Sequence, residues 1–529
     1  MTQINNPTTP AVPGEFDNPS LRVRLRQTPT LPWSARDGIF LAAAVALGLL
    51  IVDWALCGGF NLGFTLCYAL LLIWTLAYRG RSGVHVRPIG VFCGAASLAG
   101  AALFAWTADD VLCFLWLWMI ALLFCVFAAT IYGVELGGGV RLITDALRTI
   151  LPACFRNIHR PFLSVAASGN ARGGRVFRQV LLGLLLAAPV LAVVLPLLIG
   201  SDAAFEGLMR SLVGNLGDAP YRLILGLILA VLIFSLGFAL RKGLVKARVR
   251  EEREARGVLG AAAAVTLLGA LLLVYAAYLL SQLAYFFSAF SGILPVGYVF
   301  TAAEYARRGF FELCAVCAVN LLVVCILPRL TRREEGVPTA VKALCALVCV
   351  FCMIFAAVAF SKMFLYVQRF GLTRLRLLTS AFMALLVCVL LIALVQLFVQ
   401  RLPAAQLVLV LACVLGLALG YARPDAWIAR YNVERYHEGT LAELDVEYLG
   451  GLSADALPEL ISLLDSPDRE VRSAAARALN WKCEIYLTAD LQAAPSGLRA
   501  WNRSRNAART LLAENSPRIS ALLEGSPER

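Results

Sequence analysis

Residues 301–327, TAAEYARRGFFELCAVCAVNLLVVCIL, run from a polar segment into an apolar helix without a break. The apolar part is long enough to cross the hydrocarbon core of a bilayer. Glu304, Arg308 and Glu312 recur every four residues, so their charges share one helix face, and Asn320 continues that face two turns deeper. Charged and polar groups are costly at this depth, so this face is a candidate binding site.

Local structural roles compete with this interpretation. Thr301 and Glu304 have the T-x-x-E spacing of a capping box, in which the carboxylate accepts a hydrogen bond from the backbone N–H of Thr301 at the start of the helix. Arg308 and Glu312 could form an interfacial ion pair, worth a few tenths of a kcal/mol if exposed. Neither role accounts for Asn320, and a polar stripe that descends into the membrane usually faces protein rather than lipid.

Apolar runs of this kind recur along the whole chain. It has 529 residues, of which 60% are hydrophobic and 15% charged, with a mean hydropathy of +0.76, and this combination excludes a soluble globular protein. We predict an all-α, polytopic membrane protein with about eleven transmembrane helices and a small helical C-terminal soluble segment. The predicted spans are residues 38–56, 60–78, 89–106, 111–133, 178–200, 221–240, 258–285, 310–327, 340–361, 376–398 and 404–421.

Lysine and arginine gather in alternate connections between these spans, which predicts a cytoplasmic N-terminus and, with eleven spans, an extracytoplasmic C-terminus. The same placement assigns the net charge of +13 to membrane topology rather than to nucleic-acid binding. The ninth-to-tenth connection breaks the pattern. Either the number of spans before this connection differs from the predicted one, or the four cations on the outer side have a role of their own. These cations are Lys362, Arg369, Arg374 and Arg376.

Composition divides the chain into five parts. A proline-rich, basic cytoplasmic tail (1–37) precedes a four-helix membrane region (38–133). Residues 134–177 are a basic cytoplasmic segment that starts with an amphipathic helix, and residues 178–422 form a seven-helix membrane region. Residues 423–529 are more acidic than basic and include one helix pair similar to a HEAT repeat, which must dock against neighbouring helices or a partner.

Two further polar residues are candidate ligands. Asp202 follows Ser201 at the start of a predicted amphipathic helix, where a serine cap and a first-turn carboxylate explain the pair without a ligand. Gln282 shares a helix face with Tyr275 and Tyr278, which indicates either interfacial anchoring or one wall of a polar cavity.

Sequence signals for cofactor or metal chemistry are missing. Nearly all of the fifteen cysteines lie in or beside apolar spans, and the three histidines are not near them, so we predict neither structural disulfides nor a metal site. There is no P-loop, G-x-S-x-G elbow or H-E-x-x-H pair. These absences predict no cofactor and favour a role other than catalysis.

Five runs of sequence, in this order, are similar to the signature blocks of a known family. The resemblance is to a bacterial membrane-protein family described as domain-of-unknown-function family 4173, with its sister family 4153, and it covers roughly residues 178–460. It implies a bacterial cytoplasmic-membrane protein without established chemistry, so it assigns no functional residue. The runs are LPLLIGSDAAF, YLLSQLAYFF, TAAEYARRGFFEL, SKMFLYVQRFGLTRLRLL and LDVEYLGGLSADALPEL.

Three functions are compatible with these observations. The first is handling or transport of an anionic solute or lipid-linked envelope component at the outer side of the membrane. The four cations would attract the anion, and the helix face of Glu304, Arg308 and Glu312 would balance charge or carry protons. The second is a non-catalytic sensor or assembly scaffold that engages an envelope protein through residues 424–529. The third is a transferase that acts on lipid-linked substrates through a single carboxylate. The expected binding partner is the lipid bilayer, and no nucleic-acid partner is expected.

Overall fold

The computed structural model describes residues 32–80, 86–161 except 138 and 140, single positions between 183 and 205, and residues 219–245, 258–291, 310–331, 338–399, 401–488 and 497–524. In these residues the secondary structure is helical, apart from one isolated bridge between Leu259 and Thr331. The fold class is therefore all-α, as the sequence predicts.

Ten of the described helices are long and apolar enough to cross a membrane. They match ten of the eleven predicted spans, whereas the predicted span at 178–200 lies outside the described residues except for scattered positions. The ten are α1 (Ala35–Leu50) with η1 (Ile51–Leu56), α2 (Leu62–Arg79), α3 (Pro88–Trp106), α4 (Asp110–Ile131), α9 (Ala219–Arg241), α10 (Ala261–Ser291), α12 (Phe310–Leu330), α13 (Thr339–Phe370), α14 (Arg374–Phe398) and α15 (Ala404–Tyr421).

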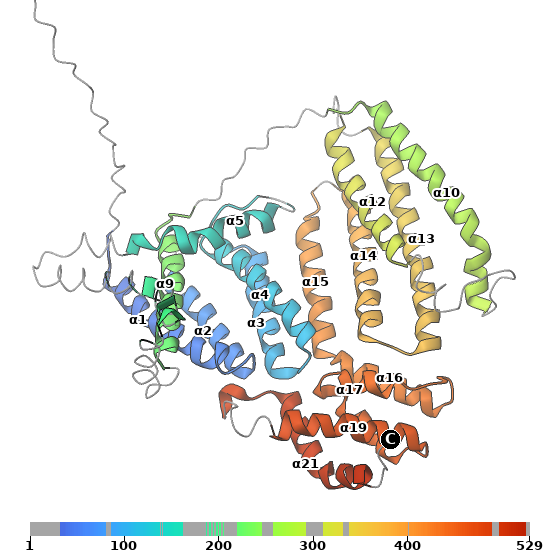
Figure 1. Ribbon diagram of the computed structural model, residues 1–529. Helices are drawn as coiled ribbons and strands as arrows, with labels where there is room; N and C mark the ends of the chain where they lie inside the picture. Colours follow the sequence, from blue (N-terminus) through green and yellow to red (C-terminus); the bar gives the residue numbers. More distant parts are fainter. Residues whose placement is uncertain are drawn as a thin grey trace, which may run out of the picture.

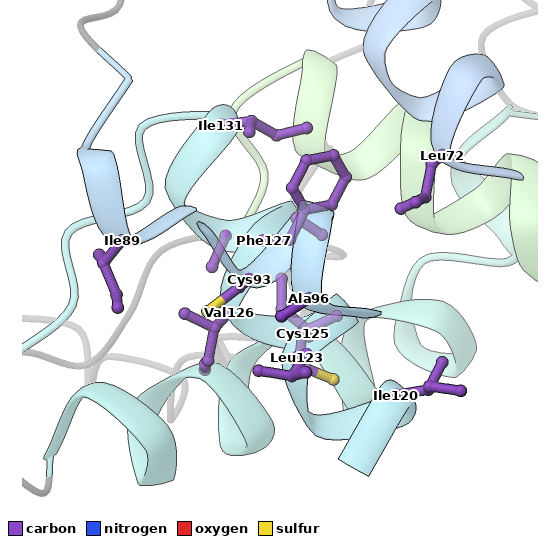
Figure 2. Packing of buried hydrophobic residues seen from close by; sticks show 14 of the residues in the cluster. Leu72, Ile89, Cys93, Ala96, Ile120, Leu123, Cys125, Val126, Phe127 and Ile131 are labelled. Atoms are coloured by element: carbon purple, nitrogen blue, oxygen red, sulfur yellow. The ribbon is translucent and has the colours of Figure 1, made fainter. Parts of the chain in front are cut away.

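The helices pack in two groups that do not follow chain order. The first group consists of α1 to α4, α9 and α15, together with α5 (Arg141–Arg156), and Figure 2 shows part of its core around Cys93 and Phe127. The second group consists of α10, α12, α13 and α14, with a separate core around Cys349 and Phe355. The two membrane cores meet where α15 contacts α14 (Figure 1).

The amphipathic segment predicted after the fourth span is helix α5. Its apolar residues Leu142, Ala146 and Ile150 are buried. They pack against α4 and α9, and Ser235 of α9 donates a hydrogen bond to the carbonyl of Cys154 at 2.9 Å. The segment is therefore part of the first group.

The C-terminal domain, residues 423–524, has a core that also includes Ala108, Leu372 and Leu377 of the membrane region. The predicted HEAT-like pair corresponds to α18 (Leu457–Ser462) and α19 (Arg469–Cys483), and Asp468 caps α19 by accepting from Glu470 N at 2.8 Å. The apolar faces of this pair are covered by helices of the same domain. These are α16 (Pro424–His437), α17 (Val446–Gly451) and α21 (Arg503–Glu524).

This domain lies across one end of the membrane helices (Figure 1). We call this the domain end, and it includes the η1–α2, α3–α4 and α13–α14 connections and the end of α15. At the opposite, far end, Arg241, the last residue of α9, and the following Lys242 contact Asp37 of α1 at 3.0 and 3.2 Å. Successive described spans from α1 to α4, and from α9 to α15, run in opposite directions between the two ends (Figure 1).

Candidate functional site

Asp109 occupies the connection between α3 and α4 at the domain end. Its Oδ1 atom accepts hydrogen bonds from Val111 N and Leu112 N at 3.0 and 3.2 Å, so it caps α4. The residue is only 1% exposed, and its Oδ2 atom is buried without a hydrogen-bond partner. The nearest cation is Arg374, whose Nε atom lies 3.8 Å from Oδ2.

Arg374 is held in place by the turn between α13 and α14. Gly371 adopts a φ of 75°, and Thr373 caps α14 by accepting from Arg376 N, so Arg374 starts the first turn of α14. Its Nε and Nη2 atoms donate to the two carboxylate oxygens of Asp425 in α16, with an Nε to Oδ1 distance of 3.1 Å. The fork geometry of a guanidinium suits such a bidentate pair.

Asp425 is fully buried, and its Oδ2 atom also accepts from Ser453 N at 2.8 Å. Asp109, Arg374 and Asp425 therefore bring together the first group, the second group and the C-terminal domain. We call these three residues the junction. A buried charge is tolerated when it is paired and hydrogen-bonded, and removal of one partner leaves the other at a high cost.

The junction lowers the acidity of Asp109. Burial and the nearby carboxylate of Asp425 raise the pKa of this carboxyl group, and the net value, after the opposing effects of Arg374 and the backbone hydrogen bonds, is about 6. Lys482 of α19 is 4% exposed and donates to the carbonyl of Leu452 at 2.7 Å. Burial lowers the pKa of Lys482, and Asp425 counteracts this change.

Further side-chain hydrogen bonds extend the contact around the junction. Asp455 accepts from Thr107 Oγ1 at 2.8 Å and from Ser504 Oγ at 2.5 Å. Asn502 donates to the carbonyls of Phe104 and Thr107 at 2.8 and 3.0 Å. Because Asp455, Asn502 and Ser504 are all at least nine-tenths buried, these bonds fix the domain on the end of the first group.

A further ion cluster joins the domain to η1. Asp53 accepts from Arg222 of α9 at 2.7 Å and from Arg499 at 2.9 Å, through separate carboxylate oxygens. In the part of the chain that the structure describes, no group of histidine, cysteine, aspartate and glutamate has the geometry of a metal site. The ionic contacts at the domain end join separate parts of the chain.

The four cations of the ninth-to-tenth connection do not form one group. Arg374 belongs to the junction. Arg376 donates to the carbonyls at the end of α13 and lies 4.1 Å from the ring centroid of Tyr366. Arg369 is exposed, whereas Lys362 is 7% exposed within α13 and lies in electrostatic range of Glu312.

The other candidate residues are dispersed. Asn320 is buried, and its Oδ1 atom accepts from the hydroxyl of Tyr275 at 2.6 Å. Glu312 and Asp202 are exposed. Glu304 and Arg308 lie outside the described residues, as does the side chain of Gln282, so the predicted charge ladder and cavity wall remain predictions.

Sequence reasoning identified Arg374 and missed both of its carboxylate partners. Asp109 could have been recognised as a helix cap, because it directly precedes the apolar run of the fourth span. Asp425 follows Pro424 at the start of a helix, and nothing in the local sequence indicates a partner elsewhere in the chain. Their proximity to Arg374 depends on how three parts of the chain pack.

The fold and the junction define a polytopic α-helical membrane protein with a helical domain docked on the ends of its spans. The chain belongs to the family described as Domain of unknown function (DUF4153), whose model matches residues 30–463. This is the sister family suggested by the sequence blocks, and family 4173 itself is not confirmed. The match also includes the first four spans. No curated protein and no solved structure matches the chain.

Proposed function

We propose that this protein is a non-catalytic membrane sensor or assembly scaffold that acts through its C-terminal domain. The observation that carries this proposal is the junction, where Arg374 of the second group pairs with Asp425 of the domain and faces Asp109 of the first group. A shift of one helix group relative to the other would alter the buried charge contact at Arg374, and the docking of the C-terminal domain would change with it.

The proposal includes a location and an orientation. We place the protein in the bacterial cytoplasmic membrane, with its far end in the cytoplasm. Arg241 and Lys242 at that end support this orientation, because basic residues concentrate on the cytoplasmic side of membrane proteins. The C-terminal domain then faces the cell envelope, where a partner protein could contact it.

A second candidate function is the handling of an anionic solute or lipid-linked envelope component. Lys362 supports it, since an ionisable residue buried in a spanning helix is a functional candidate by default. Arg374 and Arg376 support it less, because both are already engaged within the chain. We therefore rank this function below the sensor or scaffold.

The test is complementation of a strain that lacks the gene, scored by the growth or envelope phenotype of the deletion. The sensor or scaffold proposal predicts that Arg374→Met abolishes complementation, whereas Lys362→Met and Glu312→Gln retain it. Arg430→Met is the matched control, because its pair with Glu434 in α16 is exposed. Immunoblotting of membranes shows whether each variant accumulates.

The opposite pattern would overturn the proposal. If Arg374→Met complements at normal abundance while Lys362→Met does not, the ionic contact of the domain is dispensable and the second candidate takes its place.

A further inference from the structure

A pocket of about 310 Å³ lies at the domain end, beside the junction. Its wall comes from the η1–α2 connection, from α3, from the first two turns of α4 and from the C-terminal domain. The volume is at the lower limit of small-molecule sites in proteins, which span about 300–1,000 Å³. A compact polar group with a short apolar extension would fill it.

Two opposite charges line this pocket. Asp110 is the first residue of α4, and Arg505 belongs to α21. Both lie in electrostatic range of Cys113, another residue of the wall. Arg505 uses Nη1 for a long 3.4 Å hydrogen bond to Asn61, which occupies one of the five N–H donors of its guanidinium.

The remaining wall is apolar and continues into the membrane. Phe114 and Leu117 lie one and two turns inside the spanning helix α4, and Phe60 contributes from the η1–α2 connection. Phe114 is 60% exposed and Phe60 is 43% exposed, so part of the wall is also outer surface at the depth of the bilayer. Exposed Trp501 of the C-terminal domain, next to Asn502 of the wall, fits the aromatic belt of a membrane interface.

We infer that this pocket binds a zwitterionic phospholipid of the bilayer, with its phosphate at Arg505, its ammonium group at Asp110 and the start of an acyl chain along Phe114 and Leu117. Arginine matches the geometry of phosphate oxygens, and a carboxylate pairs with an ammonium group. We place the boundary between Asp110 and the apolar turns of α4 at headgroup depth, because Asp110 begins a helix that is long and apolar enough to cross the bilayer. A free phosphate would leave the apolar wall and Asp110 unmatched.

The inference does not rest on the proposed function. Asp110 and Arg505 are not members of the junction, and a lipid at this place would contact both the first group and the C-terminal domain. Such a lipid would strengthen the docking of the domain, because a ligand that binds only the docked state stabilises it.

The experiment is native mass spectrometry of the purified full chain in detergent, with dioleoyl phosphatidylethanolamine as the probe. Two compounds serve for comparison. Phosphatidylglycerol lacks the ammonium group, and O-phosphoethanolamine, used as a competitor, lacks the acyl chains. We expect one tightly retained phosphatidylethanolamine, with affinity lowered about tenfold or more by Arg505→Gln. Asp110→Asn should weaken phosphatidylethanolamine and leave phosphatidylglycerol unchanged.

Leu117→Trp fills the apolar part of the pocket without a change of charge and should also displace the lipid. Arg477→Gln, at an exposed position of α19, is the control and should leave binding intact. Thermal unfolding shows whether each variant is folded. Equal retention of lipid by wild type, Arg505→Gln and Leu117→Trp would overturn the site. Tighter binding of phosphatidylglycerol than phosphatidylethanolamine, or equal competition by O-phosphoethanolamine, would overturn the assignment of its ligand.

Discussion

Asp109 is the residue whose protonation state matters most at the junction. Its ordinary pKa is 3.8, and burial raises the value in the folded protein to about 6. Between these two values the folded state holds a proton that the unfolded state releases. The contribution of Asp109 to stability therefore falls as the pH rises from about 4 to about 6, and then stays at the lower level.

Asp109→Asn should remove this pH dependence. Asparagine keeps the oxygen that caps α4 and is neutral at every pH, as the protonated aspartic acid is. We expect the variant to gain thermal stability relative to wild type at pH 7.5 and to gain little at pH 4.5. The measurement is the melting temperature of both proteins in detergent across this range. A difference that is the same at both pH values would contradict the role of Asp109.

Arg374→Met should cost about 3–5 kcal/mol, because Asp425 is fully buried and would lose its guanidinium partner. The double variant Arg374→Met with Asp425→Asn should recover part of this loss, since it no longer buries an unpaired charge. Denaturant unfolding of the two single variants and the double variant gives the coupling. Arg430→Met, which breaks an exposed pair in α16, should change stability by less than about 1 kcal/mol. Additive effects at Arg374 and Asp425 would mean that they do not act as a pair.

At the scale of elements, α1 and α9 pack closely against each other in the first group. Asp37 binds Arg241 and Lys242 at one end of the pair, and Asp53 binds Arg222 at the other. Between these ion pairs the backbones approach at Gly48 and Gly226. A Cβ atom on Gly48 would lie 2.3 Å from the carbonyl oxygen of Gly226, so only glycine fits there. Close approach at small residues is typical of helix packing in membranes.

Gly48→Val should therefore push α1 away from α9 and destabilise the folded protein by about 1–3 kcal/mol or more. Gly269→Val is the matched control, because a Cβ atom at this glycine of α10 meets no atom within 4 Å. The control should change stability by about 0.5 kcal/mol or less. Thermal unfolding in detergent compares the two. Similar losses at both positions would show that the Gly48 contact has no special role.

At the scale of the whole molecule, the helix ends sort into two sets. The domain end holds the C-terminal domain and exposed Cys57, and the far end holds Arg241, Lys242 and α5. The packing thus gives the relative sidedness of the described helix ends without reference to charge. The distribution of basic residues then predicts which set faces the cytoplasm.

Thiol labelling of intact cells checks this orientation. An impermeant maleimide should label Cys57 in a variant that keeps this cysteine alone, and should also label a cysteine introduced at exposed Glu470 in a cysteine-free background. A cysteine introduced at exposed Arg148 of α5 should react only after permeabilisation. Cys483 is a poorer reporter, because burial raises the pKa of its thiol. Labelling of position 148 alone in intact cells would invert the orientation.

The amino-acid sequence by itself determined the class of protein and the position of ten spans, because the thickness of a bilayer converts apolar length directly into a spanning helix. It also predicted the helical C-terminal segment, whose caps and apolar spacing are local features. The tertiary structure alone decided which polar residues meet. Arg374 was predicted as an outer anion-binding cation, yet its partner is Asp425, and Asp109 faces it from the other helix group. Local patterns predict helices, whereas partners brought together by packing of distant segments leave no local signal.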